Sequence, residues 1–182
     1  MLVRKIMETA AALAGRGDLA DFLGGKRVAD VSAAQRDAET MLRCFNLAEN
    51  EAASDYLPLV AQQTFPSGGP AVFGDFEKPP LEILWVKDGT GRKLPFSVCG
   101  EGVRFPSCAA TVGYRYRPLV KDAGDETDFP NGENFLAAGA ACEFCLMEGM
   151  FERAALLDKR YKESLAAARR DKSFTLKGRK WI

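Results

Sequence analysis

Residues 135–147 form the longest apolar run of the chain and limit the folds that it can adopt. Glu143 is the only charged residue in this run, and residues 137–141 are all alanine or glycine. A helix that is apolar on every side must be surrounded by other elements. A membrane span would need about 20 apolar residues. We therefore interpret the run as a buried helix, and its small residues as positions where another backbone approaches closely.

Further helices are expected on both sides of this run. Gly149 permits a tight turn, so residues 151–170 should return as the second arm of a helix hairpin. Residues 33–56 carry an apolar stripe at helical spacing, with Ser32 as the expected N-cap and Pro58 marking the end. Two shorter helices are expected at residues 2–14 and 18–23. These elements predict a helical bundle with a long central helix and a C-terminal helix hairpin.

The middle of the chain has the pattern of strands instead. Residues 66–118 carry Pro and Gly at short intervals, and residues 81–87 and 92–98 flank an Asp-Gly turn. Tyr114 and Tyr116 alternate with polar residues, so both should lie on one face of a strand. We expect a small antiparallel sheet inserted between the helices. The fold class is therefore α+β.

Composition excludes several kinds of chemistry. The chain has 182 residues, a formal charge of zero and no histidine, so catalytic groups and zinc sites that depend on histidine are excluded. Its five cysteines have no disulfide-like spacing, which favours synthesis in a reducing cytoplasm. Cys142 and Cys145 have a redox or metal spacing, but they lie inside a helix without a second pair. We expect no enzymatic activity, no catalytic residue, no metal and no cofactor.

An acidic stretch runs from Asp122 to Glu133. Its carboxylates could gather a divalent ion, but they lack the spacing of a calcium-binding loop. A solvated loop is the simpler interpretation. The acids concerned are Asp122, Asp125, Glu126 and Asp128.

The last residues form a basic tail. Residues 169–182 hold six Lys or Arg and one acid, and the chain closes on Trp181 and Ile182. Such a tail can be a solvated end, a phosphate-binding segment or an arm that docks on another protein. The terminal Trp-Ile pair favours docking, because it offers an apolar anchor. The predicted arm consists of Arg169, Arg170, Lys172, Phe174, Leu176, Lys177, Arg179, Lys180, Trp181 and Ile182.

Three blocks of the sequence resemble the head-to-tail connector proteins of tailed bacteriophages and prophages. Residues 42–52 read LRCFNLAENEA and residues 55–59 read DYLPL, similar to the first long helix of that family. Residues 148–154, EGMFERA, and 158–165, DKRYKESL, resemble its later helix hairpin. Residues 179–181, RKW, resemble its basic, Trp-bearing end. The blocks follow one another in the same order as in the family, and the resemblance covers about two thirds of the chain.

The resemblance implies a structural protein of the virion neck, made in the host cytoplasm. It implies an adaptor ring, usually twelvefold, that lies beneath the portal protein, joins the capsid to the next neck or tail ring and lets double-stranded DNA pass without sequence-specific binding. No membrane is involved. Acidic residues facing the channel would repel phosphate. Two sets of acids fit that role, namely residues 122–128 or the face with Glu49 and Glu51.

The sequence thus predicts a single connector domain at residues 1–168, with a β insertion at 66–118 and a docking arm at 169–182. Three alternatives remain open. The chain could be a small nucleic-acid-binding protein that uses its basic tail, a stopper or tail-terminator ring of the same neck, or a redox protein that uses Cys142 and Cys145.

Overall fold

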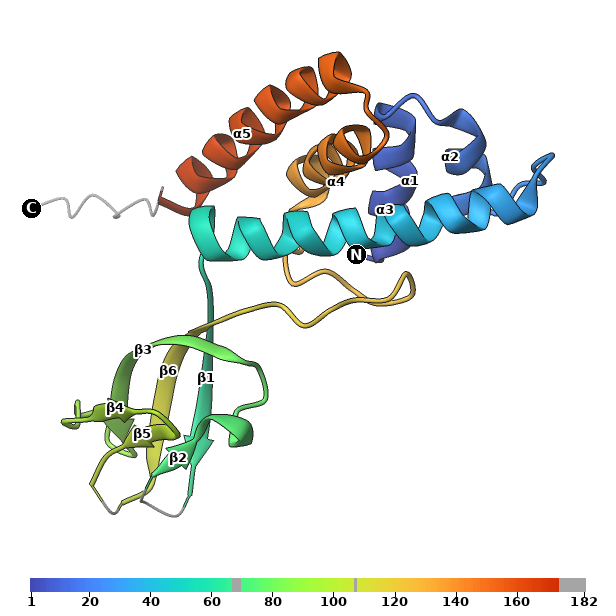
Figure 1. The fold of residues 1–182 in the computed structure, drawn as a ribbon. Helices are drawn as coiled ribbons and strands as arrows, with labels where there is room; N and C mark the ends of the chain where they lie inside the picture. Colours follow the sequence, from blue (N-terminus) through green and yellow to red (C-terminus); the bar gives the residue numbers. More distant parts are fainter. Residues whose placement is uncertain (67–69, 107, 174–182) are drawn as a thin grey trace, which may run out of the picture. The chain divides into compact units, whose positions relative to one another are not determined.

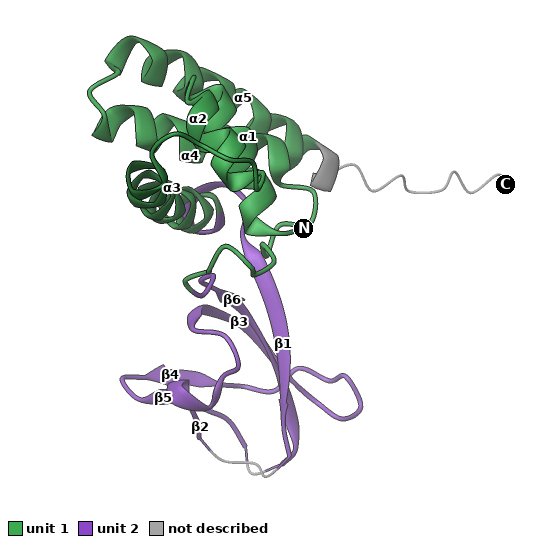
Figure 2. Cartoon of the chain, turned by 90° about the vertical axis from the view of Figure 1, so that its right-hand side faces the viewer, with its two compact units in different colours: residues 1–52, 120–182 green, residues 53–119 purple. Residues whose placement is uncertain are grey.

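The computed structural model describes residues 1–66, 70–106 and 108–173, with side chains described up to residue 170. The chain forms two compact units (Figure 2). A helical unit consists of residues 1–52 and 120–182, and a β unit consists of residues 53–119. In the sequence, the β unit therefore stands between the two parts of the helical unit, and it begins before residue 66.

The helical unit is built around the apolar run. Its helices are α1 (Val3–Leu13), α2 (Gly17–Leu23), α3 (Val31–Glu51), α4 (Glu133–Met147) and α5 (Phe151–Ser173). Helix α4 packs against α1, α3 and α5 (Figure 1), and residues 135–142 are all buried. Gly139 shows why small residues are needed, because a Cβ there would lie 3.0 Å from the Cβ of Ala48 in α3. The prediction of a surrounded helix is confirmed for residues 135–142.

The long helix begins earlier than expected. Asp30, not Ser32, is its N-cap, and the Asp30 side chain accepts a hydrogen bond from the backbone N–H of Ala33 at 2.9 Å. Asp30 has the extended backbone that an N-cap needs, whereas Ser32 already lies inside α3. After Glu51 the chain continues as a π-helical turn, Ala52–Tyr56, so the predicted end of the helix is correct.

The helix hairpin is confirmed. Gly149 adopts a φ of 72°, a conformation that glycine reaches without a steric penalty, and α5 starts two residues later. Asp158 and Lys162, one turn apart on α5, form an ion pair at 2.7 Å. Helix α5 continues to Ser173, so residues 169–173 are helical and not the start of an extended arm.

The β unit contains two small antiparallel sheets. One has the order β1 (Leu59–Phe65), β6 (Ala110–Tyr116), β3 (Pro80–Asp88). The other has the order β2 (Ala71–Val72), β5 (Gly102–Arg104), β4 (Ser97–Cys99), and a short 3₁₀ helix, Phe73–Asp75, follows β2. Tyr114 and Tyr116 lie two residues apart on β6, as expected for side chains on one face of a strand, and both are buried. The α+β class with small antiparallel sheets therefore agrees with the structure.

The predicted pairing of residues 81–87 with 92–98 holds only next to the turn. The Leu94 N–H donates to the Val86 carbonyl at 2.9 Å, and Lys87 and Lys93 form an antiparallel bridge. Asp88 Oδ1 holds the turn, because it accepts hydrogen bonds from the backbone of Thr90 and Arg92 at 2.9 and 3.0 Å. Beyond this short pairing, the first segment forms β3 and pairs with β6 instead.

Candidate functional site

The acidic loop after Leu119 is held against the start of α1. The backbone N–H groups of Val3 and Arg4 donate to the carbonyls of Asp125 and Ala123 at 2.9 and 3.0 Å. In return, Thr127 N–H donates to the Met1 carbonyl at 3.1 Å. These bonds pair the first residues of the chain with the loop. The loop therefore has a defined course on the helical unit.

Helix α3 holds the same loop through Asn46. The Asn46 side chain donates to the Lys121 carbonyl at 3.1 Å and accepts from the Lys121 N–H at 2.8 Å. The amide thus satisfies both backbone polar groups of one loop residue, and a buried loop would otherwise leave such groups without partners. Asn46 fixes the beginning of the loop.

Glu49 of α3 fixes the end of the acidic loop. Its side chain is buried, and Oε1 accepts hydrogen bonds from Thr127 Oγ1 at 2.6 Å and from the Asp128 N–H at 3.0 Å. Burial raises the pKa of the Glu49 carboxyl above its ordinary value, because the charged form is desolvated. The expectation that Glu49 lines a channel is wrong for this subunit, since the carboxylate faces the interior and not solvent.

The other predicted acids differ in their exposure. Asp128 is largely covered and pairs with Lys121 at 3.1 Å. Asp122, Asp125 and Glu126 are exposed, and Glu126 also lies 3.5 Å from the amino group of Met1. Glu51 is half-buried in a different part of the helical unit. The structure therefore presents three of the predicted acids together on one loop. Within the described ranges, no group of His, Cys, Asp or Glu has an arrangement that could hold a metal ion.

Sequence reasoning missed a set of exposed apolar residues on both sides of the hairpin turn. Met147, Phe151 and Leu156 have exposed fractions of 60, 68 and 73 %. Leu146 precedes Met147 and is also exposed. Met147 and Phe151 flank the turn, whereas Leu156 lies further along α5. Exposed apolar residues of this kind are candidates for contact surfaces. The signal was present in the sequence, because the apolar run continues to the end of α4 and Phe151 follows the turn directly.

The predicted docking arm is described only at its start. Arg169 and Arg170 are exposed on α5, and Lys172 lies in the last described turn of that helix. The remaining predicted arm residues lie outside the described residues: Phe174, Leu176, Lys177, Arg179, Lys180, Trp181 and Ile182.

The cysteines of α4 are packed in the helical unit. Cys142 and Cys145 are both free and buried, and Cys142 Sγ lies 3.4 Å from the carbonyl of Ala154 in α5. Burial raises the pKa of Cys142 to about 11 and raises that of Cys145 as well. Because the thiolate is the reactive form, this setting disfavours redox chemistry at neutral pH.

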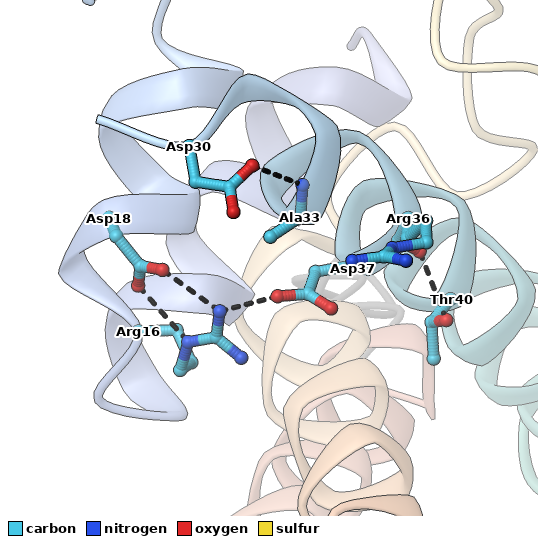
Figure 3. Close-up of polar contacts among 7 residues, drawn as sticks. All are labelled: Arg16, Asp18, Asp30, Ala33, Arg36, Asp37 and Thr40. Carbon is cyan, nitrogen blue, oxygen red and sulfur yellow. Dashed lines mark hydrogen bonds and ion pairs between the residues drawn. The ribbon is translucent and has the colours of Figure 1, made fainter. Parts of the chain in front are cut away.

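A charged cluster joins the turn after α1 to α3 (Figure 3). Arg16 donates two hydrogen bonds to the Asp18 carboxylate at 3.0 and 2.8 Å and also pairs with Asp37 of α3. The bond from Arg16 lowers the pKa of Asp18 to about 2. The guanidinium also lies 5.9 Å from the ring centre of Phe144 in α4. We assign this cluster a structural role, because it ties together three parts of the helical unit.

No protein-family model matches the chain, and no curated protein matches it. Among the described helices, none combines the length and the apolar character needed to cross a membrane.

Proposed function

We propose that this chain is a head-to-tail adaptor of a tailed phage or prophage, which forms a ring under the portal protein, joins the capsid to the neck or tail, and lets DNA pass. The observation that supports this most concerns the blocks of sequence that resemble connector proteins. Residues 42–52 and 55–59 belong to the end of α3, the π-helical turn and the start of β1, and residues 148–154 and 158–165 belong to the hairpin turn and α5. Helices α3 and α5 both pack on α4. The resembling segments therefore lie in two of the three helices that pack on α4, the most deeply buried helix.

A second observation concerns the surface of the helical unit. A ring closes through heterologous contacts, so each subunit needs a surface that fits a different surface of the next. Met147, Phe151 and Leu156 are exposed apolar residues of α4 and α5 and are available for such contacts. They could instead contact the next ring of the neck, which an adaptor also needs.

A third observation concerns the passage of DNA. Asp122, Asp125 and Glu126 are exposed on a loop that hydrogen bonds fix to α1 and α3. Acids at the wall of a channel repel the phosphates of DNA and prevent tight binding. We assign these three residues to the channel wall in the ring. Glu49 and Asp128 are not assigned to the channel wall, because Glu49 is buried and Asp128 is largely covered.

The proposal is tested with the portal oligomer encoded by the same phage genome. Full-length protein should be pulled down by the portal, and negative-stain images should show an additional ring beneath it. Substituting Arg179→Glu, Lys180→Glu and Trp181→Ala together should abolish the pull-down, since the cations steer the arm and Trp181 anchors it. The control is Arg36→Glu, which changes an exposed cation of α3 and should leave binding intact.

A full-length protein that ignores the portal at low salt and high concentration contradicts the proposal. Binding to DNA would then be measured, because Arg169 and Arg170 are exposed and four further cations follow them. A DNA affinity that falls steeply with salt and is lost with the same tail substitutions would favour the nucleic-acid-binding alternative. A complex with a neck or tail protein, but not with the portal, would favour a stopper or tail-terminator ring.

A further inference from the structure

A groove runs along α4 between α3 and α5. It has a volume of about 270 Å³, and Gly139 and Cys142 of α4 are among the residues that line it. Its polar lining is acidic, with Glu51 from α3, Glu143 from α4 and Asp158 from α5. No lysine or arginine lines it within the described part of the chain, although Lys162 pairs with Asp158 nearby. The lining of the groove therefore holds three carboxylates and no cation within the described residues.

One end of the groove is apolar. Leu146 and Phe151 both line it, and their exposed fractions are 44 and 68 %. The other end is closed by Tyr161, whose hydroxyl donates to the Ala48 carbonyl of α3 at 3.3 Å. A ligand that fits such a groove has an apolar group at one end and cations beside it.

The C-terminal segment of this chain has that chemistry. Residues 174–182 include Lys177, Arg179 and Lys180, contain no acid, and end in Trp181 and Ile182. Aromatic side chains that fill a pocket and cations that meet acids at its edge are the usual anchors of a protein interface. We propose that the groove binds residues 174–182 of a second copy of this chain.

The reach of the chain decides between the same copy and a second one. At about 1.5 Å per helical residue, Phe151 lies about 33 Å from Ser173 along α5. Trp181 follows Ser173 by eight residues, which span at most about 26–29 Å when fully extended. The backbone of the same copy at Trp181 therefore stops short of Phe151 even when it is fully extended, and the reversal of direction after Ser173 shortens its reach further. A second copy has no such limit and is therefore favoured.

This contact is head-to-tail, because the tail of one copy enters the groove of the next. It goes beyond the proposed function and does not depend on it, since it concerns the protein before a portal is present. Residues 174–182 cannot occupy a groove and a portal site at once. If both proposals hold, the portal competes with the contact between copies.

Sedimentation of the full-length chain tests the inference with two variants that damage opposite sides of one contact. Glu143→Lys reverses a charge in the groove, and Trp181→Ala removes the anchor from the tail. The wild-type mass should rise with concentration, and each variant alone should stay monomeric. An equimolar mixture should form a one-to-one complex, because one variant keeps its tail and the other keeps its groove. The matched control is Glu39→Lys, an exposed acid of α3 outside this groove, which should associate like the wild type.

A wild-type chain that stays monomeric at every concentration overturns the inference, and so does a mixture that forms no complex. Association that survives both substitutions overturns it as well, because it would then use another surface. Failure to bind the portal, with self-association intact, would reject the adaptor and keep this contact. Each variant's fold is checked by circular dichroism, and a synthetic peptide of residues 174–182 should dissociate the wild-type complex if the contact is the one proposed.

Discussion

At the scale of single residues, Glu49 is the clearest case of a charged group that serves the fold. Its Oε1 atom receives two hydrogen bonds from the acidic loop, whereas its Oε2 atom is buried and has no hydrogen-bond partner within the described residues. Burial raises the pKa of the carboxyl, and the bonds from Thr127 and Asp128 oppose that shift without cancelling it. Ionised Glu49 therefore holds the loop but is itself disfavoured by its surroundings.

This balance predicts how stability changes with pH. Because the pKa of Glu49 is higher in the folded protein than its ordinary value of 4.5, the folded state binds more protons between the two values. The contribution of Glu49 to the free energy of unfolding should therefore fall as pH rises from 4.5 through the folded pKa, and then stay constant. Glu49→Gln keeps an oxygen acceptor and does not titrate. Relative to wild type, this variant should gain stability across that window, as measured by denaturant unfolding at several pH values.

The matched control for this test is Glu39→Gln. Glu39 is exposed on the same helix and makes none of the contacts of Glu49, so its replacement controls for the loss of one carboxylate from α3. If Glu49→Gln loses stability equally at every pH, the carboxylate contributes only through its hydrogen bonds, and the predicted effect of burial is wrong.

At the scale of elements, the beginning of α3 depends on one side chain. Asp30 accepts a hydrogen bond from the Ala33 N–H, and a carboxylate at a helix N-terminus also interacts favourably with the helix dipole. Asp30→Ala should lower the free energy of unfolding of the helical unit by about 1 kcal/mol. Ser32→Ala should change it little, because Ser32 is exposed inside α3 and does not cap it. Asp30→Asn keeps the acceptor and should restore most of the loss. Denaturant unfolding followed by far-UV circular dichroism measures all three, and a larger loss for Ser32→Ala would reverse the assignment of the cap.

Local sequence patterns were sufficient to predict the main helices. The stripe on residues 33–56 and the run at 135–147 predicted α3 and α4, because burial of a helix face leaves a repeat in the sequence. Glu49 could have been recognised as buried from the same pattern, since it lies four residues after Phe45 and eight after Met41, which are both buried. Its charge led to the opposite expectation. A buried carboxylate can be predicted only when its hydrogen-bond partner is known. The partner of Glu49 is Thr127, which lies far away in the sequence.

Local sequence patterns did not predict how the strands pair. The Asp-Gly turn after Lys87 predicts a hairpin, yet β3 finds its partner in β6, more than twenty residues later. Strand pairing of this kind is decided by packing between distant segments, which no local signal records. Strand β1 was missed for a related reason. Its residues, LVAQQTF, alternate in burial, but Ala61 and Gln63 give little apolar contrast.

At the scale of the whole molecule, each unit has its own core. Buried residues of the helical unit include Phe45, Leu136 and Phe144. In the β unit, Tyr114 packs edge-on against Phe76 with ring centres 4.8 Å apart, and Val86 and Val112 are buried as well. A compact unit with its own core can unfold as a separate cooperative unit. Substitutions in one unit should then leave the stability of the other unchanged.

Gly113 provides the test from the β side. A Cβ at this position in β6 would lie 2.2 Å from Cε2 of Trp85 in β3. Gly113→Ala should therefore push the Trp85 ring away from β6. Overpacking of this kind costs about 1–3 kcal/mol. Hydrogen exchange read segment by segment should show lower protection in β1, β3 and β6 and unchanged protection in α3 and α4. Gly89→Ala is the control in the same unit, because nothing lies within 4 Å of its Cβ. Asp30→Ala should give the reverse pattern, with protection lost in the helical unit alone. Equal loss in both units for either substitution would mean that the chain unfolds as one cooperative body, and the division at residues 53 and 119 would then have no energetic meaning.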